Sequence, residues 1–424
     1  MEATIENKVG FKKTKLGWIP EDWEMVILNE FIREIKSGWS PKCPQEQASH
    51  GEWGSLKTSS ITWDGYIPTE NKKLPANLEP RSDIEVQKGD VLITRVGPRN
   101  RVGVVVWVDK DQPKLMLSDN MFGVKIKERI IPSFLALVLG TKKIQNLWNQ
   151  QIAGLAEAQV VINQKTIKKT PIPLPSLPEQ QKIATILSTW DKAIDKLSLL
   201  IAEKEALKKG LMQQLLTGKK RFPGFTDAWK EVKLGDAAIF RRGSFPQPYG
   251  LPEWYDDENG YPFVQVYDVD ENMKLKPLTK RRISSLAADQ SVFVERGTVV
   301  LTIQGSIGRI ALTQYDSYVD RTLLIFTSFR ERMDPVFFMY VVQELFEREK
   351  HRAPGGTIKT ITKEKLTSFK ILIASFEEQQ KIASVLSVAD KEIETLNNEL
   401  NALKEQKRGL MQKLLTGQVR VKTE

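Results

Sequence analysis

The sequence predicts an α/β (α+β) fold in which two β-rich domains with flanking helices are joined by two long antiparallel coiled-coil helices, as an internal pseudo-two-fold repeat. Residues 176–218 and 375–417 align without a gap at a constant offset of 199 and are identical at 22 of 43 positions. Both segments place apolar residues at alternating intervals of four and three, which is the pattern of a coiled-coil seam. The segments between them contain short β-branched runs that are typical of strands.

The repeat defines the expected domain organisation. A period near 200 residues is too long for a solenoid and indicates two similar halves. Residues 15–23 and 221–229 resemble each other as well, so each β-rich block is entered in the same way and the chain is cyclically organised. The predicted segments are a lead-in (1–22), a first block (23–175), a central helix (176–218), a linker (219–228), a second block (229–374), and a C-terminal helix with its tail (375–424).

Each repeated segment is predicted to be a long helix. Ser176 with Glu179, and Ser375 with Glu378, have the spacing of a capping box, and a glycine closes each segment. At 1.5 Å per residue, each helix would be about 60 Å long. The predicted seam consists of Ile183, Leu187, Trp190, Ile194, Leu197 and Ile201 in the first copy, and of Ile382, Leu386, Ile393, Leu396, Leu400 and Leu403 in the second.

The economical partner for one seam is the other, and antiparallel pairing would put the two blocks at opposite ends. The alternative is that each helix packs only on its own block. Lys208 and Lys407 interrupt the stripe, which leaves open whether that end splays or binds something else.

The two blocks share a skeleton and differ in detail. Strands are expected at 91–93, 102–108, 299–303 and 323–326, and a helix follows in each block at 133–150 and 335–350. The offset between matching features drifts from 206 to 208 within the blocks, whereas it stays at 199 in the helices. Insertions and deletions therefore fall in the blocks, as expected for two binding modules with different targets on one frame.

Composition favours a polyanionic partner. The chain of 424 residues carries a formal net charge of +10 and has a pI near 9.3. A merely basic surface is the alternative on charge alone. The single cysteine, Cys43, excludes a disulfide framework and fits a reducing compartment. The first residues lack a signal peptide's apolar core, and no apolar run approaches the roughly 18 residues of a membrane span, so a cytoplasmic protein without membrane partners is expected.

The sequence lacks the catalytic motifs that would identify an enzyme. There is no Pro-Pro dipeptide, which the N-P-P-Y motif of an adenine methyltransferase requires, and no phosphate-binding loop of the P-loop type. His50 and His351 are the only histidines, and His50 with Cys43 is too small a set for a metal site. We therefore expect no catalytic residue, no metal and no cofactor in this chain.

The remaining candidates suit the recognition of nucleic acid, because arginine and glutamine read guanine and adenine edges through paired hydrogen bonds. Turns after the predicted strands could enter a groove or hold phosphates, although exposed turns with solvated side chains are an equal alternative. The candidate DNA-binding residues are Lys57, Thr58, Ser59, Arg95, Arg99 and Arg101 in the first block, and Gln265, Tyr267, Asp268, Gln304, Ser306, Arg309, Thr357 and Lys359 in the second.

The order of block, E-Q-Q-K-I-A helix, L-L-T-G, second block and second E-Q-Q-K-I-A helix resembles the specificity subunit of type I restriction–modification systems. The resemblance covers essentially the whole chain. An I-P-L-P strand precedes the first helix at 172–175, and the second copy departs slightly with I-L-I-A.

The resemblance implies that each block is a target recognition domain for one half of a split, asymmetric double-stranded DNA site, with the coiled coil fixing the spacing between halves. It further implies two modification (methyltransferase) subunits, which use S-adenosylmethionine to methylate adenine, and two motor-nuclease (restriction) subunits. The alternatives are a stand-alone two-headed DNA-binding regulator, an adaptor that binds only protein, and, least favoured, an all-in-one enzyme.

Overall fold

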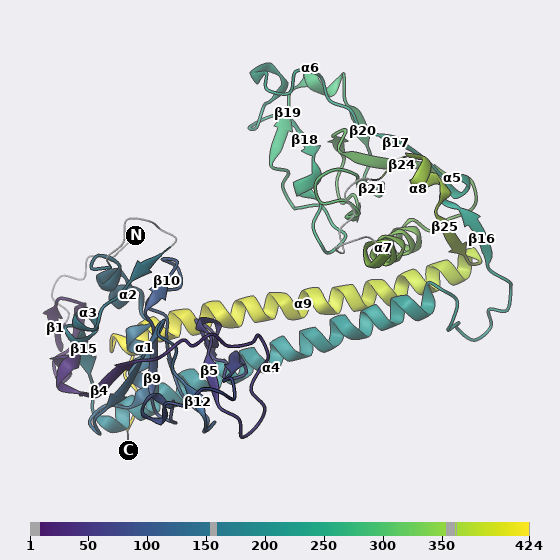
Figure 1. The fold of residues 1–424 in the computed structure, drawn as a ribbon. Coiled ribbons are helices and arrows are strands. Elements are labelled where there is room, and N and C mark those ends of the chain that lie inside the picture. Colours follow the sequence, from purple (N-terminus) through teal and green to yellow (C-terminus); the bar gives the residue numbers. More distant parts are fainter. Residues whose placement is uncertain (1–8, 153–158, 353–360, 362, 424) are drawn as a thin grey trace. The chain divides into compact units, whose positions relative to one another are not determined.

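The chain forms two compact units, and each contains one block and one end of both long helices (Figure 1). The computed structural model describes residues 9–152, 159–352, 361 and 363–423. The first unit comprises Met1–Lys196 with Leu400–Glu424, and the second comprises Leu197–Glu399. The mixed α/β fold with an internal repeat, which the sequence predicts, is confirmed.

The first unit is built in layers. A four-stranded sheet has one face toward the helices and the other toward a smaller, three-stranded sheet, with separate apolar clusters on the two sides. The four-stranded sheet has the order β11 (Val105–Trp107), β9 (Val91–Thr94), β13 (Met121–Ile126) and β4 (Ile32–Ser37). The smaller sheet has the order β12 (Leu115–Met116), β5 (Gly54–Leu56) and β8 (Asn71–Lys73).

The second unit repeats this plan with two four-stranded sheets. Their facing sides enclose one apolar cluster, and residues from both sheets, such as Val300 and Val319, contribute to it. The inner sheet has the order β17 (Ala238–Arg242), β24 (Leu323–Phe329), β21 (Val299–Thr302) and β22 (Ile310–Leu312). The outer sheet has the order β19 (Arg281–Ile283), β18 (Tyr261–Val264), β23 (Ser317–Val319) and β20 (Val292–Val294).

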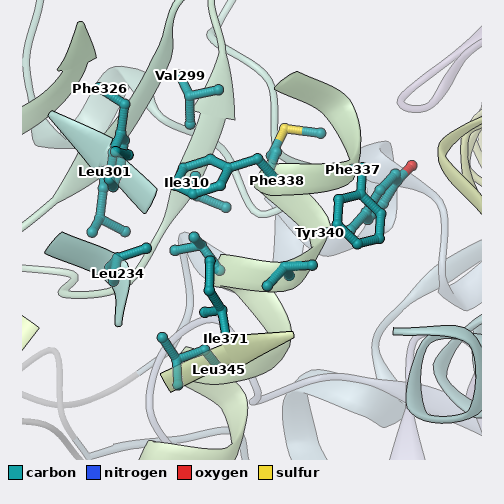
Figure 2. Packing of buried hydrophobic residues seen from close by; sticks show 14 of the residues in the cluster. Leu234, Val299, Leu301, Ile310, Phe326, Phe337, Phe338, Tyr340, Leu345 and Ile371 are labelled. Carbon is teal, nitrogen blue, oxygen red and sulfur yellow. The ribbon is translucent and has the colours of Figure 1, made fainter. Parts of the chain in front are cut away.

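Helix α7 (Pro335–Arg352) covers the inner sheet of the second unit. Figure 2 shows the aromatic ring of Phe338 packed toward Val299 and Ile310 of the sheet, whereas Phe337 lies beside Tyr340 on the other side of the helix. The matching region of the first unit holds two short helices, α1 (Pro132–Leu139) and α2 (Lys142–Asn149). The single helix predicted for 133–150 is therefore broken, because the first helix ends at its cap, Gly140.

The entrance and exit strands of each block pair with one another. Strand β3 (Glu24–Ile27) is antiparallel to β15 (Pro171–Leu174), and β16 (Lys230–Lys233) is antiparallel to β25 (Lys370–Ile373). Each block consequently starts and ends at one place, beside the start of a long helix.

The glutamate of the repeated E-Q-Q-K-I-A segment binds side chains from other parts of its unit. In the first unit, the Glu179 carboxylate accepts a hydrogen bond from Trp23 Nε1 at 3.0 Å and from Arg420 Nε at 2.7 Å. In the second, Glu378 accepts from Trp229 Nε1 at 2.9 Å and from Arg221 Nε at 3.0 Å. The capping-box interpretation is corrected, because these buried carboxylates serve tertiary partners.

The next residue, a glutamine, forms hydrogen bonds with backbone groups, including those of the loop that leads into the block's own helix. Gln180 donates to the carbonyls of Pro175 and Arg129 and accepts from the Ile131 N–H. Gln379 repeats the pattern with Ala374, Arg332 and Asp334. Since both glutamines are about 1% exposed, the E-Q pair acts as a polar connector between helix and block.

The long helices are α4 (Leu177–Leu215) and α9 (Phe376–Leu415). Every residue of the predicted seam is buried or half-buried, and Ile183, Leu187, Ile382 and Leu386 are at most 1% exposed. The pairing is antiparallel at the end that each unit contains: the Lys407 ammonium of α9 forms an ion pair with Asp191 of α4 in the first unit, and Lys208 of α4 does so with Asp390 of α9 in the second.

These ion pairs explain why Lys208 and Lys407 interrupt the apolar stripe of the two helices. Each lysine lies about two turns from the C-terminal end of its helix. Each is partly buried, with 15% of the Lys208 side chain and 23% of the Lys407 side chain exposed. Both pairs are related by the same offset of 199, so the repeat extends to the polar contacts across the seam. The helices therefore neither splay there nor leave the lysines unpaired.

Candidate nucleic-acid interface

In the first unit, the structure brings the two groups of predicted residues together. The turn that follows β9 lies against the short 3-10 helix η2 (Thr58–Ser60), which follows β5. The Arg101 guanidinium joins them by donating to the carbonyls of Thr58 and Ile61, both at 3.1 Å. Thr94 fixes the turn from inside, with its hydroxyl donating to the Arg101 carbonyl at 2.5 Å.

The other predicted residues of this surface differ in how far contacts within the protein already occupy their side chains. Arg95 lies over the Phe122 ring at 5.4 Å and donates to the Asp119 carbonyl at 3.3 Å. Lys57 lies 3.7 Å from the Glu70 carboxylate, which also accepts from the Ser59 hydroxyl. Arg99 is exposed at the tip of the turn. Arg99 is thus the predicted cation of this unit with the greatest access to a partner.

Sequence reasoning missed one aromatic residue on this surface. Trp63 is 52% exposed, and its indole N–H lies 3.5 Å from the carbonyl of Asn100, beside Arg99. An exposed indole next to arginines offers a stacking surface for a base or sugar. Its position in a short T-W-D-G turn, with no repeat partner, gave no signal in the sequence.

The second unit places its candidates in the equivalent way. The turn after β21 lies against the 3-10 helix η5 (Val266–Asp268), which follows β18. Arg309 repeats the role of Arg101, since its guanidinium donates to the Val269 carbonyl at 3.4 Å and to the Glu271 carboxylate at 2.6 Å. Thr302 repeats the role of Thr94 by donating to the Ser306 carbonyl at 2.5 Å.

Gln304 and Ser306 are exposed on this turn, whereas Gln265 and Tyr267 are half-buried and joined by a hydrogen bond from the Tyr267 hydroxyl to the Gln265 side chain. Burial raises the pKa of Tyr267 to about 12, so the phenol stays protonated at neutral pH. The structure thus assembles those predicted residues of each unit that it describes at one end of the unit's pair of sheets.

Asp268 is the exception. It is fully buried, and its carboxylate accepts hydrogen bonds from the backbone N–H groups of Gln265 and Lys280, both at 2.9 Å. Burial raises its pKa. Because this side chain holds the turn and has no access to solvent, we remove Asp268 from the candidate DNA contacts. Thr357 and Lys359 lie outside the described residues.

Two other kinds of site are absent from the described residues. No group of three or more histidine, cysteine, aspartate or glutamate side chains in that part of the chain is placed to hold a metal ion. No helix there is long and apolar enough to cross a membrane.

The geometry defines a duplicated recognition protein, with one polar, arginine-bearing surface on each copy of a common frame. The chain belongs to the family described as the type I restriction modification DNA specificity domain, which matches it twice, at residues 20–203 and 226–405. It therefore functions as a DNA specificity subunit of a type I restriction–modification system, and the reading as a stand-alone regulator is not favoured.

Two known relatives match this chain in sequence over nearly its whole length, and a third matches less than half of it. The putative type I restriction enzyme MjaX specificity subunit of Methanocaldococcus jannaschii is 27% identical over 429 residues, which is 97% of each chain. The MjaVIII specificity subunit of the same organism is 26% identical over 433 residues, or 95% of this chain and 94% of that one. The EcoEI specificity subunit of Escherichia coli is 35% identical over 181 residues, or 42% of this chain and 30% of that one.

Two solved structures have a similar fold. The S subunit of a type I restriction–modification system from M. genitalium matches with a TM-score of 0.58 and 16% identity over 92% of this chain and 96% of that one. A chain from a structure concerned with complex assembly and conformational transition of the type I R-M system matches with a TM-score of 0.59 and 20% identity, over 95% of this chain and 99% of that one.

Proposed function

We propose that each unit reads one half of a bipartite, asymmetric double-stranded DNA site through the surface formed by the turn and the 3-10 helix. The observation that carries this proposal is that the two surfaces occupy equivalent places on a repeated frame but present different side chains. Arg95 of the first unit corresponds to Ile303 of the second, since each backbone N–H donates to the equivalent carbonyl, of Asn120 or Thr322. Two different surfaces suit an asymmetric site.

The candidate contacts in this proposal are those with accessible polar groups. They are Lys57, Thr58, Ser59, Arg95 and Arg99 in the first unit, and Gln265, Tyr267, Gln304 and Ser306 in the second. Arg101 and Arg309 position the surfaces by holding the 3-10 helices against the turns. Positioning residues of this kind fix the geometry that lets neighbours discriminate bases.

The chain would recognise DNA without transforming it, and catalysis would belong to partner subunits. We propose two modification subunits, which bind S-adenosylmethionine and methylate adenine, and two motor-nuclease subunits. The names of the relatives, all specificity subunits of restriction enzymes, support this division of labour. Work on cellular DNA would place the complex in the cytoplasm.

The long helices would serve both as the docking surface for these subunits and as the element that sets the spacing of half-sites. Several of their large apolar side chains are exposed on the chain by itself, including Leu199 at 66%, Leu207 at 58% and Val388 at 65%. Exposed apolar residues on a helix face are typical of a protein–protein contact.

Site selection by the complete chain tests the function. The purified chain with its modification subunit should methylate one split sequence in a pool of random duplexes, and the chain alone should methylate none. Replacing residues 23–175 with the corresponding block of a relative should change one half of the selected sequence and leave the other half as it was. Methyl transfer by the highly purified chain alone, or a change in both halves, would contradict the proposal.

A further inference from the structure

Three cations of the second unit lie over the faces of three tyrosines. The Arg281 guanidinium carbon is 3.8 Å from the Tyr255 ring centre, that of Arg321 is 4.8 Å from Tyr249, and the Lys280 ammonium is 4.8 Å from Tyr267. A cation at this distance is attracted to the ring face. We call these six residues the cation–tyrosine cluster.

Hydrogen bonds fix the tyrosines in place. The Tyr249 hydroxyl donates to the carboxylate of Asp320, which is 1% exposed and also accepts from the Thr322 hydroxyl at 2.6 Å. The Tyr255 hydroxyl donates to the Tyr249 carbonyl at 2.8 Å. Burial raises the pKa of Tyr249 and of Tyr255, which keeps both phenols protonated as donors. The rings are therefore a rigid platform for the cations above them.

The cation–tyrosine cluster is continuous with the turn after β21, which carries the candidate DNA contacts Gln304 and Ser306. Strands β18 and β23 are parallel, so Tyr267 and Arg321, which follow them, emerge at the same edge of the outer sheet. The Ile303 N–H at the start of the turn donates to the Thr322 carbonyl at 3.0 Å, next to Arg321. One surface therefore extends from Gln304 to Lys280.

The cations of the cluster are not equivalent. Arg281 is already committed, since its Nε lies 3.1 Å from the Asp257 carboxylate. Arg321 and Lys280 are exposed, and no carboxylate of the described residues lies within ion-pair distance of either. An arginine whose orientation is set by stacking loses little freedom on binding and presents its donors as a fork.

A purely structural role predicts that Arg321 should recur in the first unit, whose frame is the same. The equivalent position there holds Asp119, because the residues that follow the two positions, Asn120 and Thr322, accept the same backbone hydrogen bond. The Asp119 carboxylate accepts from the Ser40 hydroxyl. A cation in one copy and an anion in the other point to a role in recognition.

We propose that the cation–tyrosine cluster is the centre of DNA contact in the second unit, with Arg321 reading a base edge and Lys280 contacting phosphate. This inference rests on the proposed function. The chemistry favours guanine, because an arginine fork matches its O6 and N7 acceptors in the major groove. Arg281 is a positioning residue that holds Tyr255 and the start of β19.

The test compares the full-length chain with Arg321→Ala, Arg321→Lys and Lys280→Ala variants in DNA selection and binding across a range of salt concentrations. Arg321→Ala should relax one or two positions of a single half-site and lower affinity for the best site about 10- to 100-fold. Arg321→Lys, which keeps the charge without the fork, should relax the same positions. Lys280→Ala should weaken binding to all sequences and reduce the salt slope by about 0.9.

Lys370→Ala is the matched control, since it removes an exposed charge from β25 of the same unit, where the lysine pairs with Glu231 at 2.7 Å. It should leave the selected sequence unchanged. An unchanged sequence and affinity in both Arg321→Ala and Lys280→Ala would overturn the inference. Uniform weakening by Arg321→Ala with normal selection would overturn the base-reading role. A wild-type chain that selects no split site would instead contradict the proposed function.

Discussion

The two units use the same three side chains at the junction with the long helices but supply them from different parts of the chain. In the second unit, Arg221 of the linker and Trp229, the first residue of the second block, meet at Glu378. In the first, Trp23 comes from the N-terminal region and Arg420 from the C-terminal region, and Glu179 receives both. In the second unit the arginine and the tryptophan are joined by a few residues of continuous chain. In the first unit the equivalent arginine and tryptophan come from opposite ends of the sequence and are brought together by non-covalent contacts.

The junctions of the two units use the same residue types, whereas the candidate DNA-binding surfaces of the two units use different ones. A cation stands at position 95 in the first unit and at position 321 in the second, and the equivalent positions hold Ile303 and Asp119. The comparison separates two kinds of residue. The glutamate, tryptophan and arginine that build the junctions are of the same type in both copies, whereas residues that face outward at the ends of the sheets differ.

The largest expected effect is on the junction. Glu378→Ala removes the acceptor of the half-buried Trp229 indole N–H and leaves Arg221, whose side chain is 24% exposed, without its ion pair. We expect a loss of about 3 kcal/mol in the unfolding free energy of the second unit. Glu179→Ala should cost less, about 2 kcal/mol, because Arg420 is 45% exposed and keeps Asp22 at 2.8 Å.

Urea unfolding followed by tryptophan fluorescence measures both changes, and Glu378→Gln is the control that retains an acceptor for Trp229. Equal costs in the two units, or costs below about 0.5 kcal/mol, would show that the junctions do not contribute as their geometry indicates.

The second prediction exchanges the surfaces. Arg95→Ile with Asp119→Arg gives the first unit the second unit's arrangement of charge at these two positions. Because the frame is common, the variant should fold, and its preference should change by about 1–3 kcal/mol at positions within one half-site. Sequence selection from a random pool reports the change, and single substitutions show which position carries it. Alteration of both half-sites would mean that the two surfaces do not read independently.

The sequence predicted the two long helices of the frame well because their residues follow periodic patterns. The offset of 199, the apolar intervals of four and three, and the closing glycines identify α4 and α9 almost to their ends. The same pattern predicted the seam, from Ile183 to Leu403, that the burial of these residues confirms. These features depend on neighbours three or four residues apart, which a sequence displays directly.

Contacts between residues far apart in the sequence could not be predicted in the same way. Glu179 suggested a local cap, but its partners lie 156 and 241 residues away. Lys208 and Lys407 read as interruptions of the stripe because their partners, Asp390 and Asp191, lie on the other helix. Asp268 looked like an exposed turn residue, although its carboxylate is fully buried. In each case the missing information was which distant segment would supply the partner.

The third prediction compares the two ion pairs across the seam. Asp390 forms a pair with Lys208 and also accepts from the Tyr340 hydroxyl of α7 at 2.5 Å, whereas the described contacts of Asp191 include Lys407 without an aromatic hydroxyl. Asp390→Ala should therefore cost about 2 kcal/mol and Asp191→Ala about 1 kcal/mol.

A double-mutant cycle with Tyr340→Phe separates the two contributions in the second unit. If the hydroxyl matters, Asp390→Ala should cost less in the Phe background than in the wild type. A cost that is the same in both backgrounds would assign the whole effect to Lys208.

The smallest effect is expected where an ion pair in one unit has apolar counterparts in the other. Lys204 and Glu392 pair at 2.5 Å with 32% and 47% of their side chains exposed, and the repeat places Leu403 and Ala193 at the equivalent positions. Because water screens such a pair, Lys204→Leu with Glu392→Ala should change the unfolding free energy by less than about 0.5 kcal/mol. Thermal unfolding of the double variant beside each single variant measures it. A loss above about 1 kcal/mol would show that the charges at this position contribute to the frame as strongly as the buried pairs do.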